Sequence, residues 1–76
     1  MVVAYVLVTA ATGEAERLKA AMADIDGVVS VDVVAGDVDF VVKVEVDSPE
    51  DVRGVAADRI HAIDGVADTR TYIAMD

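Results

Sequence analysis

The tetrapeptide Ile-Asp-Gly-Val occurs twice in this chain, at residues 25–28 and again at residues 63–66. The two copies lie 38 positions apart in a chain of 76 residues, so the chain is twice as long as its repeat. A repeat of fixed period indicates one supersecondary unit used twice. The same shift pairs valine with valine at three more positions, Val3 with Val41, Val6 with Val44 and Val8 with Val46. The residue pattern within each copy predicts that the unit is a strand, a helix and a strand.

The first copy begins with a run rich in β-branched residues, over residues 2–9, which predicts a strand. Thr12 then offers a hydroxyl group to cap a helix, and Gly27 is placed to end that helix. The apolar residues of the helix recur at helical spacing, at Ala15, Leu18, Met22 and Ile25. A second strand is expected over residues 28–35.

The second copy is joined to the first by a hairpin. Gly36-Asp37 is expected to form a two-residue loop, a type II′ turn, ahead of a third strand over residues 38–46. Ser48-Pro49 has the residues of a helix start, and this helix is expected to stop at Gly65 before a last strand over residues 66–74. The residues that it is expected to bury are Val52, Val55, Ala56, Ile60 and Ile63.

The resulting order, βαββαβ, predicts an α+β ferredoxin-like plait, a four-stranded antiparallel sheet with both helices on one face. The first and third strands are expected at its centre. Alternate residues of these two strands are wholly apolar and are expected to face the helices: Val2, Ala4, Val6 and Val8, and Phe40, Val42, Val44 and Val46. A chain of this length is expected to form one domain, residues 1–76.

The opposite face of the sheet is expected to combine apolar residues with charges around them. The apolar residues are Val3, Tyr5, Leu7, Val34, Val41 and Tyr72. Because a sheet face in contact with water is normally polar, this pattern predicts a homodimer packed sheet face to sheet face. Arg70 is then expected to be an ion-pair partner for Asp32 or Glu45 at that interface. The alternative is that these residues stand there for their strand propensity alone.

Charge and composition narrow the class of function. Fifteen acidic residues against six basic ones give a formal net charge of −9, which disfavours direct binding of nucleic acid. A hydrophobic content of 55% argues against a disordered acidic chain. A folded domain that is rich in Asp, Val and Ala and poor in Lys resembles in composition the proteins of salt-loving (halophilic) archaea, in which salt screens dense surface carboxylates.

The residues that usually carry catalysis or bind metal are scarce. The chain has no cysteine, and its only histidine, His61, is interpreted as a solvated helix residue. No cluster of ligands predicts a metal ion or another cofactor. No catalytic residue is assigned, and the protein is not expected to be an enzyme. The apolar run at residues 2–11 is too short to span a bilayer, and we expect a cytoplasmic protein that does not bind membranes.

The hairpin at residues 34–40, the two Asp-Gly-Val helix exits and the final Thr69-Arg70-Thr71 resemble the effector-binding (RAM) domain of the Lrp/AsnC transcriptional regulators. The resemblance covers the whole chain. Those regulators place a DNA-binding helix-turn-helix ahead of this domain, and since this chain begins with the first strand it looks like a stand-alone version. The resemblance implies a domain that dimerises through its sheets, gathers as dimers into larger rings such as octamers, and binds a small effector, usually an amino acid, between dimers.

The resemblance also assigns residues to the effector site: Gly36, Asp37, Asp39, Thr69 and Thr71. A glycine turn exposes backbone N–H groups that suit a carboxylate, and a nearby aspartate suits an α-ammonium group. The threonines would add hydroxyl groups, although strand alternation also allows them to face the core. A purely structural role for the hairpin residues remains open, because any tight hairpin uses glycine and aspartate.

Three functions remain open. The first is a regulatory module that oligomerises and binds an amino acid, acting on transcription or metabolism through protein partners. The second is an assembly domain without a ligand that joins full-length, DNA-binding Lrp/AsnC relatives. The third is a small dimeric plait enzyme that uses His61.

Overall fold

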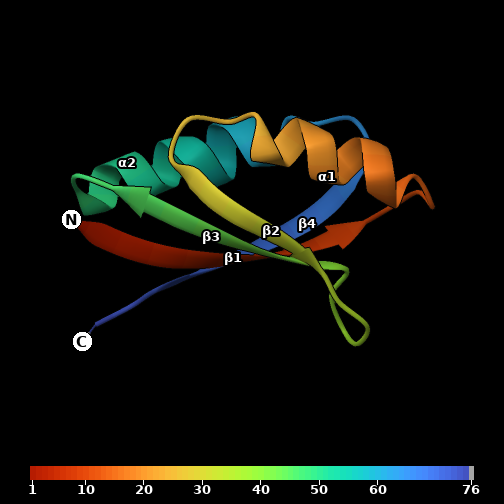
Figure 1. Cartoon of the computed structure of the whole chain (residues 1–76), viewed down its shortest axis with the longest axis horizontal. Coiled ribbons are helices and arrows are strands. Elements are labelled where there is room, and N and C mark those ends of the chain that lie inside the picture. The colour runs from red at the N-terminus through yellow and green to blue at the C-terminus, as the bar shows by residue number, and fades with distance from the viewer. Residues whose placement is uncertain (76) are drawn as a thin grey trace.

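The computed structural model describes residues 1–75 and arranges them as the predicted βαββαβ plait (Figure 1). The elements along the chain are β1 (Val2–Ala10), α1 (Ala15–Ala23), β2 (Val28–Val33), β3 (Phe40–Val46), α2 (Pro49–Arg53), the π-helix η1 (Gly54–Ile60) and β4 (Val66–Ile73). The strands form one antiparallel sheet in the order β2-β3-β1-β4. The prediction that the first and third strands lie at the centre of the sheet is confirmed.

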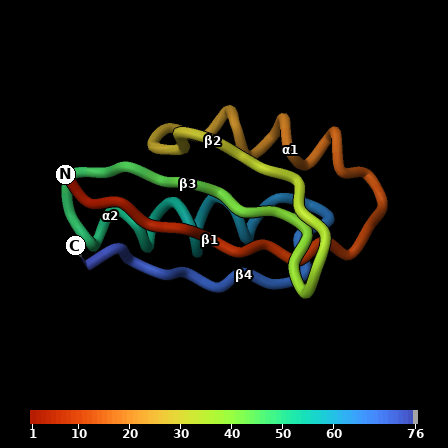
Figure 2. The backbone as a smooth tube through the Cα atoms, turned by 60° about the horizontal axis from the view of Figure 1, so that its bottom comes forward, coloured from red at the N-terminus to blue at the C-terminus, as the bar shows by residue number. Residues whose placement is uncertain are grey.

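The helices form one layer over one face of the sheet, as predicted (Figure 1). We call the face without helices the outer face. Both ends of the chain lie at the same end of the sheet, and the connection between β2 and β3 lies at the opposite end (Figure 2). This connection projects from the sheet on the side away from the helices, so it stands beside the outer face (Figure 1).

The core lies between the helices and the sheet. Ala4, Val6, Val8, Phe40, Val42 and Val44 have no exposed surface, as expected for residues that face the helices, whereas Val2 and Val46 at the strand ends are half-buried. The helices bury Leu18, Met22, Val52, Val55, Ala56 and Ile60 against them, and Ala15, Ile25 and Ile63 pack at the edge. Burial of one such side chain contributes about 1.5–3 kcal/mol, so the apolar alternation of the strands fixes which face the helices cover.

The first helix is shorter than predicted at both ends. It begins at Ala15 rather than directly after Thr12, and the Thr12 hydroxyl accepts a hydrogen bond from the Glu14 N–H at 2.8 Å within the preceding loop. The prediction that Thr12 caps the helix is therefore wrong. The helix ends at Ala23, and Gly27 follows in the turn to β2 with φ +97°, in the left-handed region that favours glycine.

The connection between β2 and β3 is longer than the predicted two-residue turn. The strands end and begin at Val33 and Phe40, and the loop between them is closed by a hydrogen bond from the Val34 N–H to the Asp39 carbonyl at 2.9 Å. Asp39 is instead held on β1, since its N–H donates to the Val8 carbonyl at 2.9 Å and its carboxylate accepts from the Ala10 N–H at 2.7 Å. The connection is therefore a longer loop that is hydrogen-bonded to β1, and not the predicted tight turn.

The second helix changes its hydrogen-bond pattern along its length. It begins after Ser48 with Pro49 in its first turn, as predicted, but its α-helical part ends at Arg53. The continuation to Ile60 is a π-helix, closed by a bond from the His61 N–H to the Ala56 carbonyl at 3.2 Å. Nothing in the apolar spacing predicted this wider helix. His61 follows it and is exposed, in agreement with its interpretation as a solvated residue.

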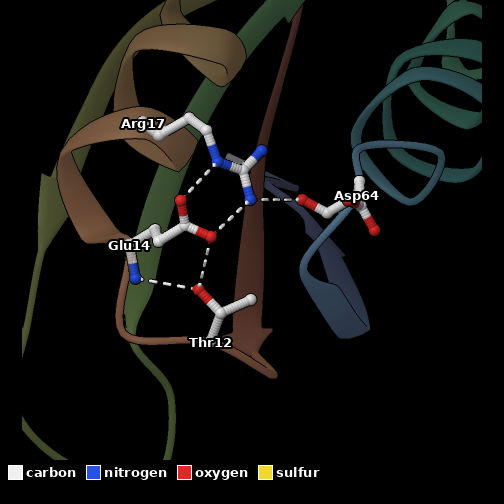
Figure 3. A network of polar contacts seen from close by, with 4 residues as sticks. All are labelled: Thr12, Glu14, Arg17 and Asp64. Atoms are coloured by element: carbon white, nitrogen blue, oxygen red, sulfur yellow. Dashed lines mark hydrogen bonds and ion pairs between the residues drawn. The ribbon is translucent and has the colours of Figure 1, made fainter.

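A polar network joins the start of α1 to the turn that leads into β4 (Figure 3). The Arg17 guanidinium donates from Nε to the Glu14 carboxylate at 3.2 Å and from Nη2 to the Asp64 carbonyl at 2.9 Å. Arg17, through its hydrogen bond and its charge, holds the pKa of the Glu14 carboxyl below its usual value. Because Glu14 and Arg17 are exposed, their ion pair contributes little, and the bond to the Asp64 carbonyl is the contact that links distant parts of the chain.

Candidate functional site

The loop between β2 and β3 carries three of the predicted site residues, and the structure gives each a different environment. Gly36 is exposed, and a Cβ atom there would meet no other atom within 4 Å. Asp37 is also exposed and lines a groove on the outer face. Asp39 is used within the fold, because its carboxylate binds the Ala10 N–H. Asp37 is therefore the acidic residue of the loop that is best placed to meet a ligand.

The groove beside Asp37 has a volume of about 500 Å³. It is formed by the last part of β1, by alternate residues of β4 and by the loop between β2 and β3. The residues that line it are Leu7, Thr9, Asp37, Val38, Asp68, Arg70 and Tyr72. It thus combines apolar side chains with the hydroxyl groups of Thr9 and Tyr72, two carboxylates and one guanidinium group.

Strand pairing explains why these side chains meet. In the antiparallel register of β1 and β4, Leu7 lies opposite Arg70 and Thr9 lies opposite Asp68. Side chains directly opposite each other on one face of a sheet have Cβ atoms only about 5 Å apart. The register shifts between Thr9 and Ala10, so the regular pairing ends where the groove ends.

The charged residues of the groove are not neutralised by one another. Within the described residues, the ion pairs are Arg17 with Glu14 and Lys43 with Glu45, and neither includes Arg70, Asp68 or Asp37. Asp68 accepts a short-range hydrogen bond from the Thr69 N–H to Oδ1 at 2.9 Å, which orients its carboxylate. Arg70 makes no ion pair with Asp32 or Glu45 within this part of the chain, so its predicted pairing across an interface stays a prediction.

Thr69 and Thr71 lie on the other side of the sheet. Their partners on β1, Val8 and Val6, are fully buried under the helices. The two threonines line a separate cleft of about 250 Å³ beside the second helix, together with Pro49, Val52, Arg53, Ala56, Ala57 and Ile73. Within one chain they therefore do not share a pocket with Asp37, and their part in an effector site stays a prediction.

The residues predicted for a dimer interface lie on the outer face or at its margin. Val3, Tyr5 and Leu7 of β1 alternate with the buried residues, and Val41 and Tyr72 stand opposite Leu7 and Tyr5 on the neighbouring strands. Tyr5 is 40% exposed and Tyr72 is 54% exposed. Val34 is half-buried and lies in the loop rather than in a strand. The face thus carries apolar side chains, two of them exposed tyrosines, beside the charges of Lys43, Glu45 and Arg70, and its role as an interface stays a prediction.

Sequence reasoning did not assign Thr9, Asp68 or Arg70 to a ligand site. The signal that could have found them is their alternation along β1 and β4, which places them on the outer face next to the predicted loop. Within residues 1–75, no group of three or more histidine, cysteine or acidic side chains is placed to hold a metal ion. No helix in this part of the chain is both long and apolar enough to cross a membrane.

Comparison with known proteins identifies a family and a fold. Residues 3–76 match the family described as the Lrp/AsnC ligand binding domain. The structure is similar to that of TTHA0845 from Thermus thermophilus, with 29% sequence identity and a TM-score of 0.94, over 100% of this chain and 95% of that one. It is also similar to the hypothetical protein PHS023 from Pyrococcus horikoshii, with 29% identity and a TM-score of 0.88, over 99% and 90% of the two chains.

A longer protein contains the same fold. The transcriptional regulator NMB0573 from Neisseria meningitidis, solved as a complex with L-Met, has a TM-score of 0.86 at 16% identity. The match covers 99% of this chain and 50% of the regulator, and at this identity the likeness shows the fold alone. No match was found among curated proteins.

Proposed function

The chain belongs to the Lrp/AsnC ligand-binding domain family, and on that premise we propose that it is a non-catalytic regulatory module that binds an amino acid in the groove beside Asp37. Residues 1–76 then form a single effector-binding and oligomerisation domain that acts in the cytoplasm on transcription or metabolism through partners. The Neisseria regulator with the same fold was solved with L-Met, which supports an amino acid as the class of ligand.

The chemistry of the groove carries this proposal. An α-amino acid presents a carboxylate and an ammonium group on one carbon atom. Arg70 offers a guanidinium group that suits the carboxylate, and Asp37 and Asp68 offer carboxylates that suit the ammonium group. Leu7, Val38 and Tyr72 offer apolar surface for a side chain. The lining contains no histidine, and His61 lies exposed at the end of η1, so the groove offers binding groups rather than a nucleophile paired with a base.

Oligomerisation is the second part of the proposal. The apolar residues of the outer face pack against the same face of a second copy, and dimers gather into a larger homo-oligomer, as the family resemblance implies. A second copy on the outer face, or a further dimer packed on the loop, would cover a ligand in the groove.

Isothermal titration calorimetry with each of the twenty L-amino acids tests the ligand. We expect saturable binding of at least one of them, and affinity at least tenfold lower in Arg70→Ala, because the charged hydrogen bond to the carboxylate is lost. Arg59→Ala removes an exposed arginine of η1 that does not line this groove, and its affinity should equal that of the wild type. Equal affinity of Arg70→Ala and the wild type would place the ligand elsewhere.

An assembly role without a ligand is the alternative, and the accessible apolar outer face favours it. In that case the chain joins full-length Lrp/AsnC regulators; it covers 50% of the length of the Neisseria regulator with the same fold. Absence of heat and of a thermal shift with every amino acid, together with a mixed complex with a full-length regulator in native mass spectrometry, would establish this alternative instead.

A further inference from the structure

The charges that line the groove do not balance. Asp37 and Asp68 carry two negative charges and Arg70 carries one positive charge, so the ionised lining has a net charge of −1. None of the three takes part in an ion pair within the described residues. A ligand that neutralises this lining brings more positive than negative charge.

A neutral amino acid leaves one of the two carboxylates without a partner. Its own carboxylate uses Arg70, and its ammonium group uses either Asp68 or Asp37. The remaining carboxylate is exposed and gains no contact with such a ligand. A second cationic group on the ligand adds a charge-assisted hydrogen bond to it.

We infer that the effector is a basic α-amino acid of the lysine class, an inference that rests on the proposed function of the groove. Asp68 and Arg70 stand two residues apart on one side of β4, about 6.7 Å between Cα atoms, so one α-carbon can place its ammonium and carboxylate groups against them. Asp37 comes from a different segment, the loop over the groove, and takes the cation at the end of the side chain.

The rest of the groove suits such a side chain. Leu7, Val38 and Tyr72 provide apolar surface, and the methylene groups of lysine pack on apolar surface while their ammonium group remains at a polar site. The formal net charge of −9 also favours a cationic ligand, because it attracts cations to the protein and repels acidic amino acids.

Three ligands of matched length test this inference by calorimetry. L-Lysine carries all three charged groups, L-norleucine lacks the ammonium group of the side chain, and cadaverine lacks the carboxylate. We expect lysine to bind at least tenfold more tightly than either of the other two. Asp37→Asn should weaken lysine about tenfold and leave norleucine unchanged. Asp58→Asn removes an exposed carboxylate outside the groove and should leave both affinities unchanged.

The possible failures are distinct. Norleucine binding as tightly as lysine would overturn the inference and leave an amino-acid site intact. Cadaverine binding as tightly as lysine would overturn it as well, since the contact of Arg70 with a carboxylate would then be unused. If none of the twenty amino acids binds to a chain that circular dichroism shows to be folded, the proposed function itself fails.

Discussion

Arg17 on α1 donates a hydrogen bond to the main-chain carbonyl of Asp64, 2.9 Å away and 47 positions later in the sequence (Figure 3). A second hydrogen bond lies nearby, from the Ala11 N–H to the Gly65 carbonyl at 2.7 Å. Together they join the start of α1 and the loop after β1 to the turn before β4. The two copies of the repeat are thus linked at the end of the sheet that also carries the groove.

Arg17→Ala is expected to lower the free energy of unfolding by about 1 kcal/mol, since the hydrogen bond to the Asp64 carbonyl is lost. Chemical denaturation followed by circular dichroism measures this change. Lys19→Ala removes another exposed cation of α1, one outside every ion pair within residues 1–75, and should change stability much less. Equal losses in the two variants would contradict a special role for Arg17.

The contribution of the contact between Glu14 and Arg17 to the free energy of unfolding depends on pH. The pKa of Glu14 is lower in the folded chain than the usual 4.5, because Arg17 hydrogen-bonds and attracts the carboxylate. The stabilisation is therefore complete above the pKa of the unfolded chain and is lost as the pH falls through the folded value. We expect the difference in unfolding free energy between the wild type and Glu14→Gln to shrink from about pH 6 toward about pH 2. A difference that stays constant over this range would refute the coupling.

Position 65 requires glycine for two reasons, its backbone conformation and the close approach of neighbouring side chains. Its φ of +104° lies in the left-handed region, and a Cβ atom would lie 2.9 Å from the Thr12 Cγ2 and 3.0 Å from the Arg17 Nη2. Gly65→Ala should cost about 2 kcal/mol or more in thermal or chemical unfolding. Gly13→Ala is the control, because a Cβ atom at Gly13 meets nothing within 4 Å. Similar losses of stability in Gly65→Ala and Gly13→Ala would show that the close approach of Thr12 and Arg17 to Gly65 does not matter.

Tyr5→Glu is expected to dissociate the proposed dimer. Tyr5 is 40% exposed on the outer face and does not line the groove, so the substitution acts on the dimer without removing a side chain that lines the groove. Light scattering after gel filtration should give a dimeric mass for the wild type and a monomeric mass for the variant. Val33→Glu places the same charge on an exposed residue of the edge strand β2, opposite Phe40, and should stay dimeric. A dimer that survives Tyr5→Glu does not use this face.

High salt is expected to stabilise the chain. Fifteen acidic residues repel one another in dilute buffer, and salt screens that repulsion. The melting temperature should rise between dilute buffer and molar KCl. A melting temperature that is unchanged or lower in molar KCl would show that the acidic composition has no such role.

The scaffold was predictable because it depends on periodicity. Alternating valines identified the buried faces of β1 and β3, and the repeat of Ile-Asp-Gly-Val identified where each helix region gives way to a strand. Both signals are local and are read directly from residue spacing. The order of strands then followed from the rules that govern βαβ connections.

The loop and the second helix were not predictable in the same way. Gly36-Asp37 is compatible with a tight turn, but Asp39 instead binds the backbone of Ala10, and that contact depends on how distant strands lie in space. Similarly, the apolar spacing of the second helix does not distinguish an α-helix from the π-helix observed after Arg53. The groove brings together Asp37 and Arg70, which lie 33 positions apart in the sequence. A search for short sequence motifs does not detect such a pair.

Leu7 and Tyr72 belong both to the groove and to the face on which a second copy is expected to pack. In the proposed dimer such sharing couples ligand binding to dimerisation, and the coupling is reciprocal: the factor by which a ligand changes the dimerisation constant equals the factor by which dimerisation changes the affinity for that ligand. The apparent affinity for the effector then depends on protein concentration. A cell that makes more of this small protein would change the effector concentration at which it responds, with no change to a single residue.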